Sequence, residues 1–143
     1  MTNQPTSPMR EKSLALAIRI VNLCKYLVGE KKEYVLSRQI LKSGTSPGAN
    51  IREAQNAEST DDFIHKLGIA QKETDETLYW LELLFRTNYL NETEFQSLTN
   101  DTDELLRLVR SAIITKKKNK LKNTTKTVLL IALFIYFTYH QFL

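Results

Sequence analysis

Apolar and small side chains recur in a regular seam within residues 63–84. The seam steps by four, three, four, three, four and three residues through Phe63, Leu67, Ala70, Thr74, Thr77, Leu81 and Leu84. This heptad-like spacing places one row of side chains on one face of an α-helix. We expect a helix that is capped by Ser59 or Thr60 and ends near Thr87 or Asn88. Such a stripe needs other helices to cover it.

Residues 9–28 also have helical spacing. We expect a helix from Met9 or Ser13 to Val28, with Ser7 or Ser13 as its cap and Gly29 as the glycine that follows its last turn. Its expected core stripe is Leu14, Ile18, Val21 and Val28, widened by Leu16, Ile20, Leu23 and Leu27.

A second helix is expected from near Glu33 to about Ala57, and it contains the strongest helix breakers of the chain, in the stretch SGTSPGAN at residues 43–50. Either two short helices meet here, or one helix continues with a bend at Gly44–Gly48. We favour the single bent helix, because a full turn would remove much of its buried face. The small residues Gly48, Ala49 and Ala54 would let a neighbouring helix approach closely.

The fourth expected helix starts at Asn91, with Glu94 as its capping-box partner, and runs to about Thr115. Its stripe is Phe95, Leu98, Thr102, Leu105, Val109 and Ala112. Four amphipathic helices with short links predict an all-α fold, an antiparallel up-and-down four-helix bundle. The expected organisation is a disordered start over 1–8, the bundle over 9–115, a basic linker over 116–126 and a C-terminal apolar helix over 127–143.

Charge is distributed unevenly along the chain. Residues 1–57 carry nine Lys or Arg and four Asp or Glu, which gives +5, whereas residues 58–115 carry five against twelve, which gives −7. Residues 116–126 add six lysines and no acid. The body over 1–115 is thus slightly acidic, which is not typical of a protein built to grip nucleic acid as a monomer.

The segment 127–143 contains an unbroken apolar or aromatic run without a polar face, Val128 to Phe137, and the residues after it include Thr138, His140 and Gln141. As a helix it would measure about 25 Å, near the short limit for crossing a hydrocarbon core of about 30 Å. The preceding lysines and the aromatic Tyr136 and Tyr139 are typical of a membrane anchor with the bundle in the cytoplasm, attached to the inner membrane. A buried segment of the fold and an extension without a partner are the alternatives.

Few residues point to catalysis. Cys24 lies near the first stripe and is best interpreted as a small buried hydrophobe. His65 follows Asp62 at the i, i+3 spacing of bundle metal sites, but that motif occurs once, and we expect no metal and no cofactor. Gly44 and Gly48 are too close for a Walker phosphate loop. The acidic run at residues 73–76 is interpreted as a salt-bridged face, with Lys72 and Arg52 as partners.

The remaining candidate function is the binding of a macromolecular partner. Candidate contacts to a nucleic acid or a protein partner are the cations of the first half, Arg19, Lys25, Lys31, Lys32, Arg38, Lys42 and Arg52. Tyr79 and Trp80 are adjacent in the third helix, so one of them points partly outward from the seam. They are candidates for an oligomer interface, and Trp80 for peripheral core as the alternative.

Two stretches carry a family resemblance. The segment from Arg38 through SGTSPGANIREA, together with AQKETDETLYWLELL at residues 70–84, resembles the bacterial four helix bundle proteins, also called 23S rRNA intervening-sequence proteins. The resemblance covers roughly residues 10–115. It implies four antiparallel helices and homo-oligomeric rings, commonly pentamers. A related branch is the accessory variability determinant protein of diversity-generating retroelements, which partners a reverse transcriptase and binds nucleic acid.

We therefore expect a non-enzymatic oligomeric adaptor or scaffold that binds a protein or RNA partner. The alternative is a protein that binds RNA or DNA directly through a basic face of its first two helices. The residues after 115 are not covered by the resemblance.

Overall fold

The computed structural model describes residues 7–141, and all regular secondary structure in this range is α-helix. The helices are α1 (Pro8–Gly29), α2 (Leu36–Gln55), α3 (Thr60–Arg86) and α4 (Glu92–Gln141). The expected all-α class is confirmed. Residues 1–6 of the expected disordered start and residues 142–143 of the expected tail lie outside the described residues.

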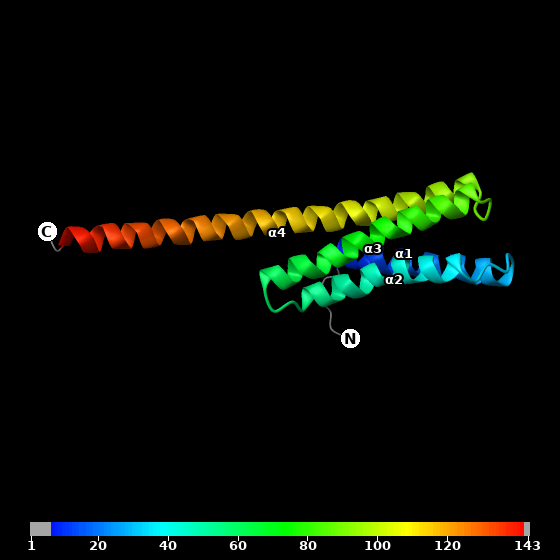
Figure 1. Ribbon diagram of the computed structural model, residues 1–143, viewed down its shortest axis with the longest axis horizontal. Coiled ribbons are helices and arrows are strands. Elements are labelled where there is room, and N and C mark those ends of the chain that lie inside the picture. Colours follow the sequence, from blue (N-terminus) through cyan, green and yellow to red (C-terminus); the bar gives the residue numbers. More distant parts are fainter. Residues whose placement is uncertain (1–6, 142–143) are drawn as a thin grey trace.

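Each helix packs against two others. α1 lies against α2 and α4, and α3 lies against the same two helices. In Figure 1 the first three helices and the beginning of α4 share one region, while the rest of α4 continues far past them. All four helices contribute to one core, in which Ile20, Ile40, Leu81 and Leu105 are each 0% exposed. The stripes that could not be stable alone in water therefore cover one another.

The seam of α3 is confirmed. Its buried residues are Leu67, Ala70, Thr74, Thr77, Leu81 and Leu84. Phe63 is partly buried against the same core. The hydroxyl of Ser59 accepts a hydrogen bond from the N–H of Asp62 at 3.1 Å, so Ser59 is the cap. The helix ends at Arg86, one residue before the expected range.

The packing side of α1 differs from the expected one. Its buried residues are Ser13, Leu16, Ile20, Leu23, Cys24 and Leu27. The centre of the expected stripe faces outward, since Leu14, Ile18 and Val28 are 48%, 54% and 39% exposed. That prediction was wrong because α1 has apolar residues on two sides, and spacing alone does not tell which side meets the other helices. The positions expected only to widen the stripe form the core.

The ends of α1 are also set differently. The hydroxyl of Ser7 accepts from the N–H of Arg10 at 3.3 Å, and Pro8 occupies the first turn, where its missing N–H is harmless. The helix thus begins inside the expected disordered start. Gly29 is the last helical residue and has no positive φ, so its expected role as the glycine after the helix was wrong. The positive φ occurs at Lys32, at 54°.

α2 is a single helix that continues through Gly44, Pro47 and Gly48. The single-helix alternative is therefore confirmed, and the bend stays a prediction. Gly44 makes the close approach to α1, because a Cβ built on it would lie 2.7 Å from Cγ1 of Ile20. The expectation had assigned this approach to Gly48, Ala49 and Ala54, but a Cβ on Gly48 would meet only ordinary contacts, the nearest at 3.6 Å from the hydroxyl oxygen of Ser13.

The beginning of α4 agrees with the sequence. Asn91 and Glu94 form a reciprocal capping box, with N–H to carboxylate and N–H to amide oxygen distances of 3.0 and 2.9 Å. The residues of the expected stripe are buried or packed against the core, and Leu106 and Ile113 join them. The helix does not stop at Thr115, however, and residues 116–126 are helical.

The physical reason for this long helix lies in the sequence. Residues 92–141 contain neither glycine nor proline, so neither of the two residues that most disfavour a helix interior lies within α4. The expected linker and the expected separate apolar helix are both continuations of α4 up to Gln141. Within residues 7–141, no helix combines the length and the apolar character needed to cross a membrane.

Candidate functional site

The outer side of α1 carries a row of mostly apolar residues that the fold leaves uncovered. The row steps through Leu14, Ile18, Val21, Lys25 and Val28, at the four-three spacing of a helix-packing seam. Val21 is half-buried and the other four are exposed. Sequence reasoning missed this surface by assigning it to the core, although the charged Lys25 in the middle of the row is a signal that the row faces water.

The row borders α2 along two shallow grooves. At one end, Val21, Lys25 and Val28 line a groove with Leu41 of α2, which is 38% exposed. At the other end, the second groove is lined by Ser13, Leu14, Ala17, Thr45, Gly48, Ala49 and Arg52. The small side chains here leave room for a side chain from outside. We call the row together with these two grooves the α1–α2 face.

The cations predicted to contact a partner divide into two groups. Arg19 is used inside the fold, because its guanidinium pairs with Asp101 of α4 and donates to the hydroxyl of Ser97 at 2.9 Å. Lys31 and Lys32 lie in the connection after α1. The ammonium of Lys32 donates to the carbonyl of Gly29 at 2.7 Å, and that of Lys31 lies 5.6 Å from the ring centroid of Tyr26.

Of the other four cations, Lys25 and Arg52 line the grooves of the α1–α2 face. Lys25 belongs to its row, and Arg38, Lys42 and Arg52 are exposed residues of α2. Among residues 7–141 none of these four forms an ion pair. Arg38, Lys42 and Arg52 share one side of α2, because positions 38, 42, 45, 49 and 52 follow the same four-three spacing. The α1–α2 face therefore combines apolar side chains with exposed positive charges.

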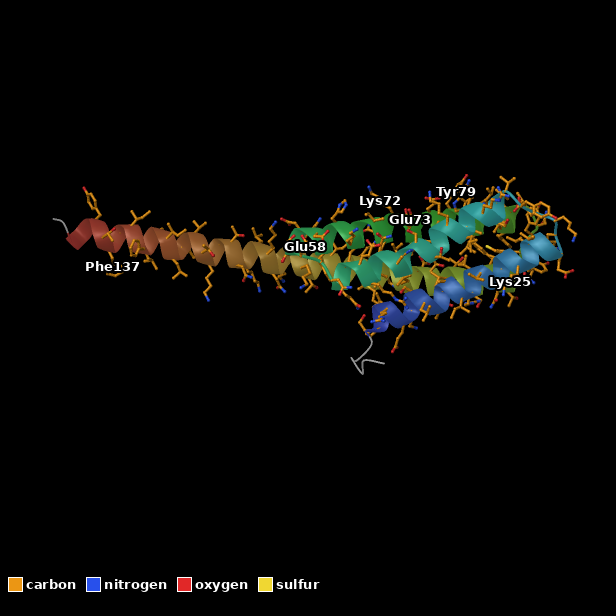
Figure 2. All side chains as sticks on the ribbon, turned by 90° about the horizontal axis from the view of Figure 1, so that it is seen from below. Lys25, Glu58, Lys72, Glu73, Tyr79 and Phe137 are labelled. Carbon is orange, nitrogen blue, oxygen red and sulfur yellow. The ribbon has the colours of Figure 1, made fainter. Side chains whose placement is uncertain are left out.

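The aromatic pair of α3 is a separate feature. The rings of Tyr79 and Trp80 meet edge to face, with centroids 4.9 Å apart, and the indole N–H of Trp80 donates to Glu76 at 3.0 Å. Trp80 packs partly against the core, whereas Tyr79 is 57% exposed. Figure 2 shows Tyr79 and Lys25 on opposite edges of the bundle. The aromatic pair and the α1–α2 face therefore do not form one patch.

The residues that could carry chemistry are not brought together. Cys24 is buried, and its thiol donates to the carbonyl of Ser37 at 3.2 Å. Burial, with the nearby Glu33 carboxylate, raises the pKa of this thiol to about 11, which keeps it protonated at neutral pH. His65 is exposed. In the described part of the chain, no three His, Cys, Asp or Glu side chains are grouped to hold a metal.

The acidic run of α3 has other ion-pair and hydrogen-bond partners than those expected. Asp75 lies 3.6 Å from the guanidinium of Arg110 in α4, and Glu76 accepts from Trp80. The partners named from the sequence were Lys72 and Arg52, and no ion pair joins either of them to this run within residues 7–141. Asp75 therefore helps to join α3 to α4.

Glu33 has a structural role that sequence reasoning did not identify. Its carboxylate accepts from the N–H groups of Val35, Leu36 and Ser37 at 2.9, 2.9 and 2.7 Å, and so covers the start of α2. Partial burial alone would raise the pKa of this carboxyl, but the three backbone donors outweigh it and lower the pKa. A glutamate three residues before a helical stretch is the signal that could have identified it.

Comparison with known proteins adds two findings. The family model of the 23S rRNA-intervening sequence protein matches residues 7–111. The chain is also similar to the 1.70 Å crystal structure of a protein with unknown function from the S23 ribosomal protein family, from Bacteroides thetaiotaomicron VPI-5482. The two are 57% identical, the TM-score is 0.73, and the match covers 73% of this chain and 97% of the other. None of the curated proteins matches this chain.

Proposed function

The chain belongs to the 23S rRNA-intervening sequence protein family, and from this premise we propose that it is a non-enzymatic oligomeric adaptor. Copies of the chain would associate, and the assembly would bind a protein or RNA partner. The observation that carries the proposal is the uncovered apolar row on α1 within the α1–α2 face. Contiguous apolar surface in contact with water is costly, and in soluble proteins it marks interaction sites.

The proposal includes the arrangement of the helices. We propose an antiparallel up-and-down bundle with α2 bent at Gly44–Gly48. Its support is that helices consecutive in the chain pack against each other and are joined by connections of a few residues, at 30–35, 56–59 and 87–91. This arrangement places α1 and α2 side by side with a common outer surface.

We propose self-association through this surface as the first step. The row on α1 has the spacing with which helices pack, and opposite charges on different parts of the chain favour contacts between unlike surfaces of two copies. Rings of such copies, with five as the number implied by the resemblance, would repeat the cations of the α1–α2 face at regular intervals. Tyr79 is a second candidate contact on the other side of the bundle.

Light scattering on the full chain tests this step. The expected result is a mass of several protomers, which Ile18→Asp lowers because it places a carboxylate in the apolar row. Ile114→Asp is the matched control, since Ile114 is 65% exposed on α4 and lies outside the row. A monomeric wild-type chain, or an equal effect of the two variants, would contradict the proposal.

Absence of enzymatic activity is part of the proposal. Its support is the chemistry of the few candidates, above all a Cys24 thiol that is buried and has a raised pKa of about 11. A nucleophilic cysteine needs an accessible thiolate, which is the opposite condition.

Direct RNA or DNA binding is the second candidate function, and the row Arg38, Lys42 and Arg52 favours it. Cations on one side of a helix at this spacing can contact successive phosphates. Lys42→Gln should weaken binding of a labelled RNA and reduce the salt dependence of the binding constant by about one released ion. The control is Lys72→Gln, at an exposed position of α3, which should change neither. RNA binding that is absent at physiological salt would leave only the adaptor.

We further propose that the protein works in the cytoplasm and that residues 127–143 contact the inner membrane. The support is the uncovered apolar surface of this part of α4 and the lysines that precede it. The alternatives to a membrane on this surface are a protein partner or a second copy of the chain.

A further inference from the structure

The part of α4 beyond the bundle exposes apolar side chains on every side. Within residues 128–139, each large hydrophobic side chain is between 54% and 70% exposed. Figure 2 shows Phe137 at the far end of this projecting helix, away from every other helix. Since the run has no polar face, only a surrounding that is itself apolar can cover it.

Five of the six lysines before this run fall into two groups, which the sequence does not distinguish. The ammonium of Lys116 lies 4.9 Å from the ring centroid of Phe63, and that of Lys120 reaches the carboxylate of Asp61 at 2.7 Å. Both residues therefore face the start of α3. These two contacts hold the base of the extension to the bundle.

Lys118, Lys122 and Lys126 form a second row. Their spacing of four residues places them along one side of α4, roughly opposite Lys116 and Lys120 at about 100° per residue. Within the described residues none of the three has an ion-pair partner. The chain has no Asp or Glu after Glu104, so no acid on the extension itself can neutralise this row. Because α4 is continuous, the row and the apolar run are held in a fixed relation.

We propose that Lys118, Lys122 and Lys126 form a binding row for an anionic phospholipid surface, with the apolar residues 128–137 entering the acyl region beside it. This inference rests on the proposed membrane contact of residues 127–143 and names its lipid class and its charged residues. An anionic bilayer is the occupant that satisfies both parts, since negative headgroups lie directly above an apolar layer. A nucleic acid would pair with the lysines but leave the apolar run in water. A second copy packed in parallel would place two lysine rows against each other.

Vesicle co-sedimentation of the full chain tests the row. The chain should bind vesicles of phosphatidylcholine mixed with phosphatidylglycerol more tightly than vesicles of phosphatidylcholine alone, and the difference should shrink as salt is raised. The double variant Lys118→Gln with Lys122→Gln should weaken binding to the anionic vesicles about 30-fold, from about 1 kcal/mol for each lysine near such a surface.

The matched control is Lys116→Gln with Lys120→Gln. It removes the same charge from the same eleven-residue stretch, residues 116–126, but takes it from lysines that face α3. Its effect on binding should be several-fold smaller, and circular dichroism should show that both variants remain helical. Leu130→Asp should abolish binding to both kinds of vesicle, because it places a charge in the apolar run.

Each of the other outcomes would contradict a specific part of the proposal. Equal weakening by the two double variants would mean that only net charge acts, and the row would be rejected. Equal binding to neutral and anionic vesicles would reject the lipid class while leaving the proposed membrane contact intact. Binding to neither kind of vesicle would reject both the lipid class and the proposed membrane contact. Binding of RNA to the lysine row without vesicle binding would also reject both. Neither result would bear on the association of copies through α1.

Discussion

The two parts of α4 have the same secondary structure but opposite surroundings. In residues 92–115 one side of the helix is covered, and Leu105 is 0% exposed. In residues 116–139 every residue is exposed, and Leu130 is 58% exposed. Composition separates them less than contacts do, since both parts are rich in leucine and other aliphatic residues.

The continuity of a helix and its burial in the tertiary structure therefore have separate causes. The helix continues because no glycine or proline interrupts it, whereas burial requires a neighbouring surface. α2 ends and α3 begins near the base of the extension, and α4 continues past them (Figure 1). The packed part should therefore carry the stability of the fold, and the extension should contribute little to it.

The largest expected effect comes from the same substitution in the two parts. Leu105→Asp should unfold the protein, because an unpaired buried carboxylate costs several kcal/mol against a total stability of about 5–15 kcal/mol. Leu130→Asp should leave the melting temperature nearly unchanged, because its side chain is already in water. Thermal denaturation followed by circular dichroism measures both. If the two variants melted alike, the division of α4 into a packed and an uncovered part would be wrong.

A second pair of variants measures how closely the packed part is fitted. Gly44→Ala should destabilise by about 1–3 kcal/mol, since the new Cβ would overlap Ile20 of α1. Gly68→Ala should stabilise by up to about 1 kcal/mol, because it also lies within a helix and its Cβ meets nothing within 4 Å. Both substitutions have the same effect on helix propensity, so urea denaturation of the two isolates the contact between α1 and α2. Stabilisation by Gly44→Ala would show that the helices can move apart at no cost.

The smallest expected effect concerns acid. Glu33 has a lowered pKa in the folded chain, so its contribution is complete above the ordinary glutamate value of 4.5 and is lost as the pH falls through the lower folded value. Glu33→Gln should therefore cost about 1 kcal/mol at neutral pH and much less in acid, where the wild-type carboxyl is itself protonated. Urea denaturation at both pH values checks this, with the exposed Glu30→Gln as the control. The extension has no Asp or Glu, so this response of an acidic side chain belongs to the packed part.

The sequence by itself determined the helices and much of their packing. The spacing in α3 and in residues 92–115 of α4 predicts most of their buried residues, and Ser59 and the Asn91–Glu94 pair mark where these two helices begin. The sequence is also consistent with a continuous α4, because residues 92–141 contain neither glycine nor proline, although the run of lysines and asparagines suggested a linker. These features depend on neighbours only a few residues apart.

Only the tertiary structure decided which side of α1 is buried and which lysines of α4 remain available. α1 has apolar residues on two sides, and the side with Ile20 is chosen because Gly44 of α2 leaves space for it. Lys116 and Lys120 differ from Lys118 and Lys122 because only the first two face Phe63 and Asp61 of α3. In each case the deciding atom belongs to another helix. Spacing along one helix fixes which residues share a side, but the side that packs is the one whose shape and charge a neighbouring helix complements.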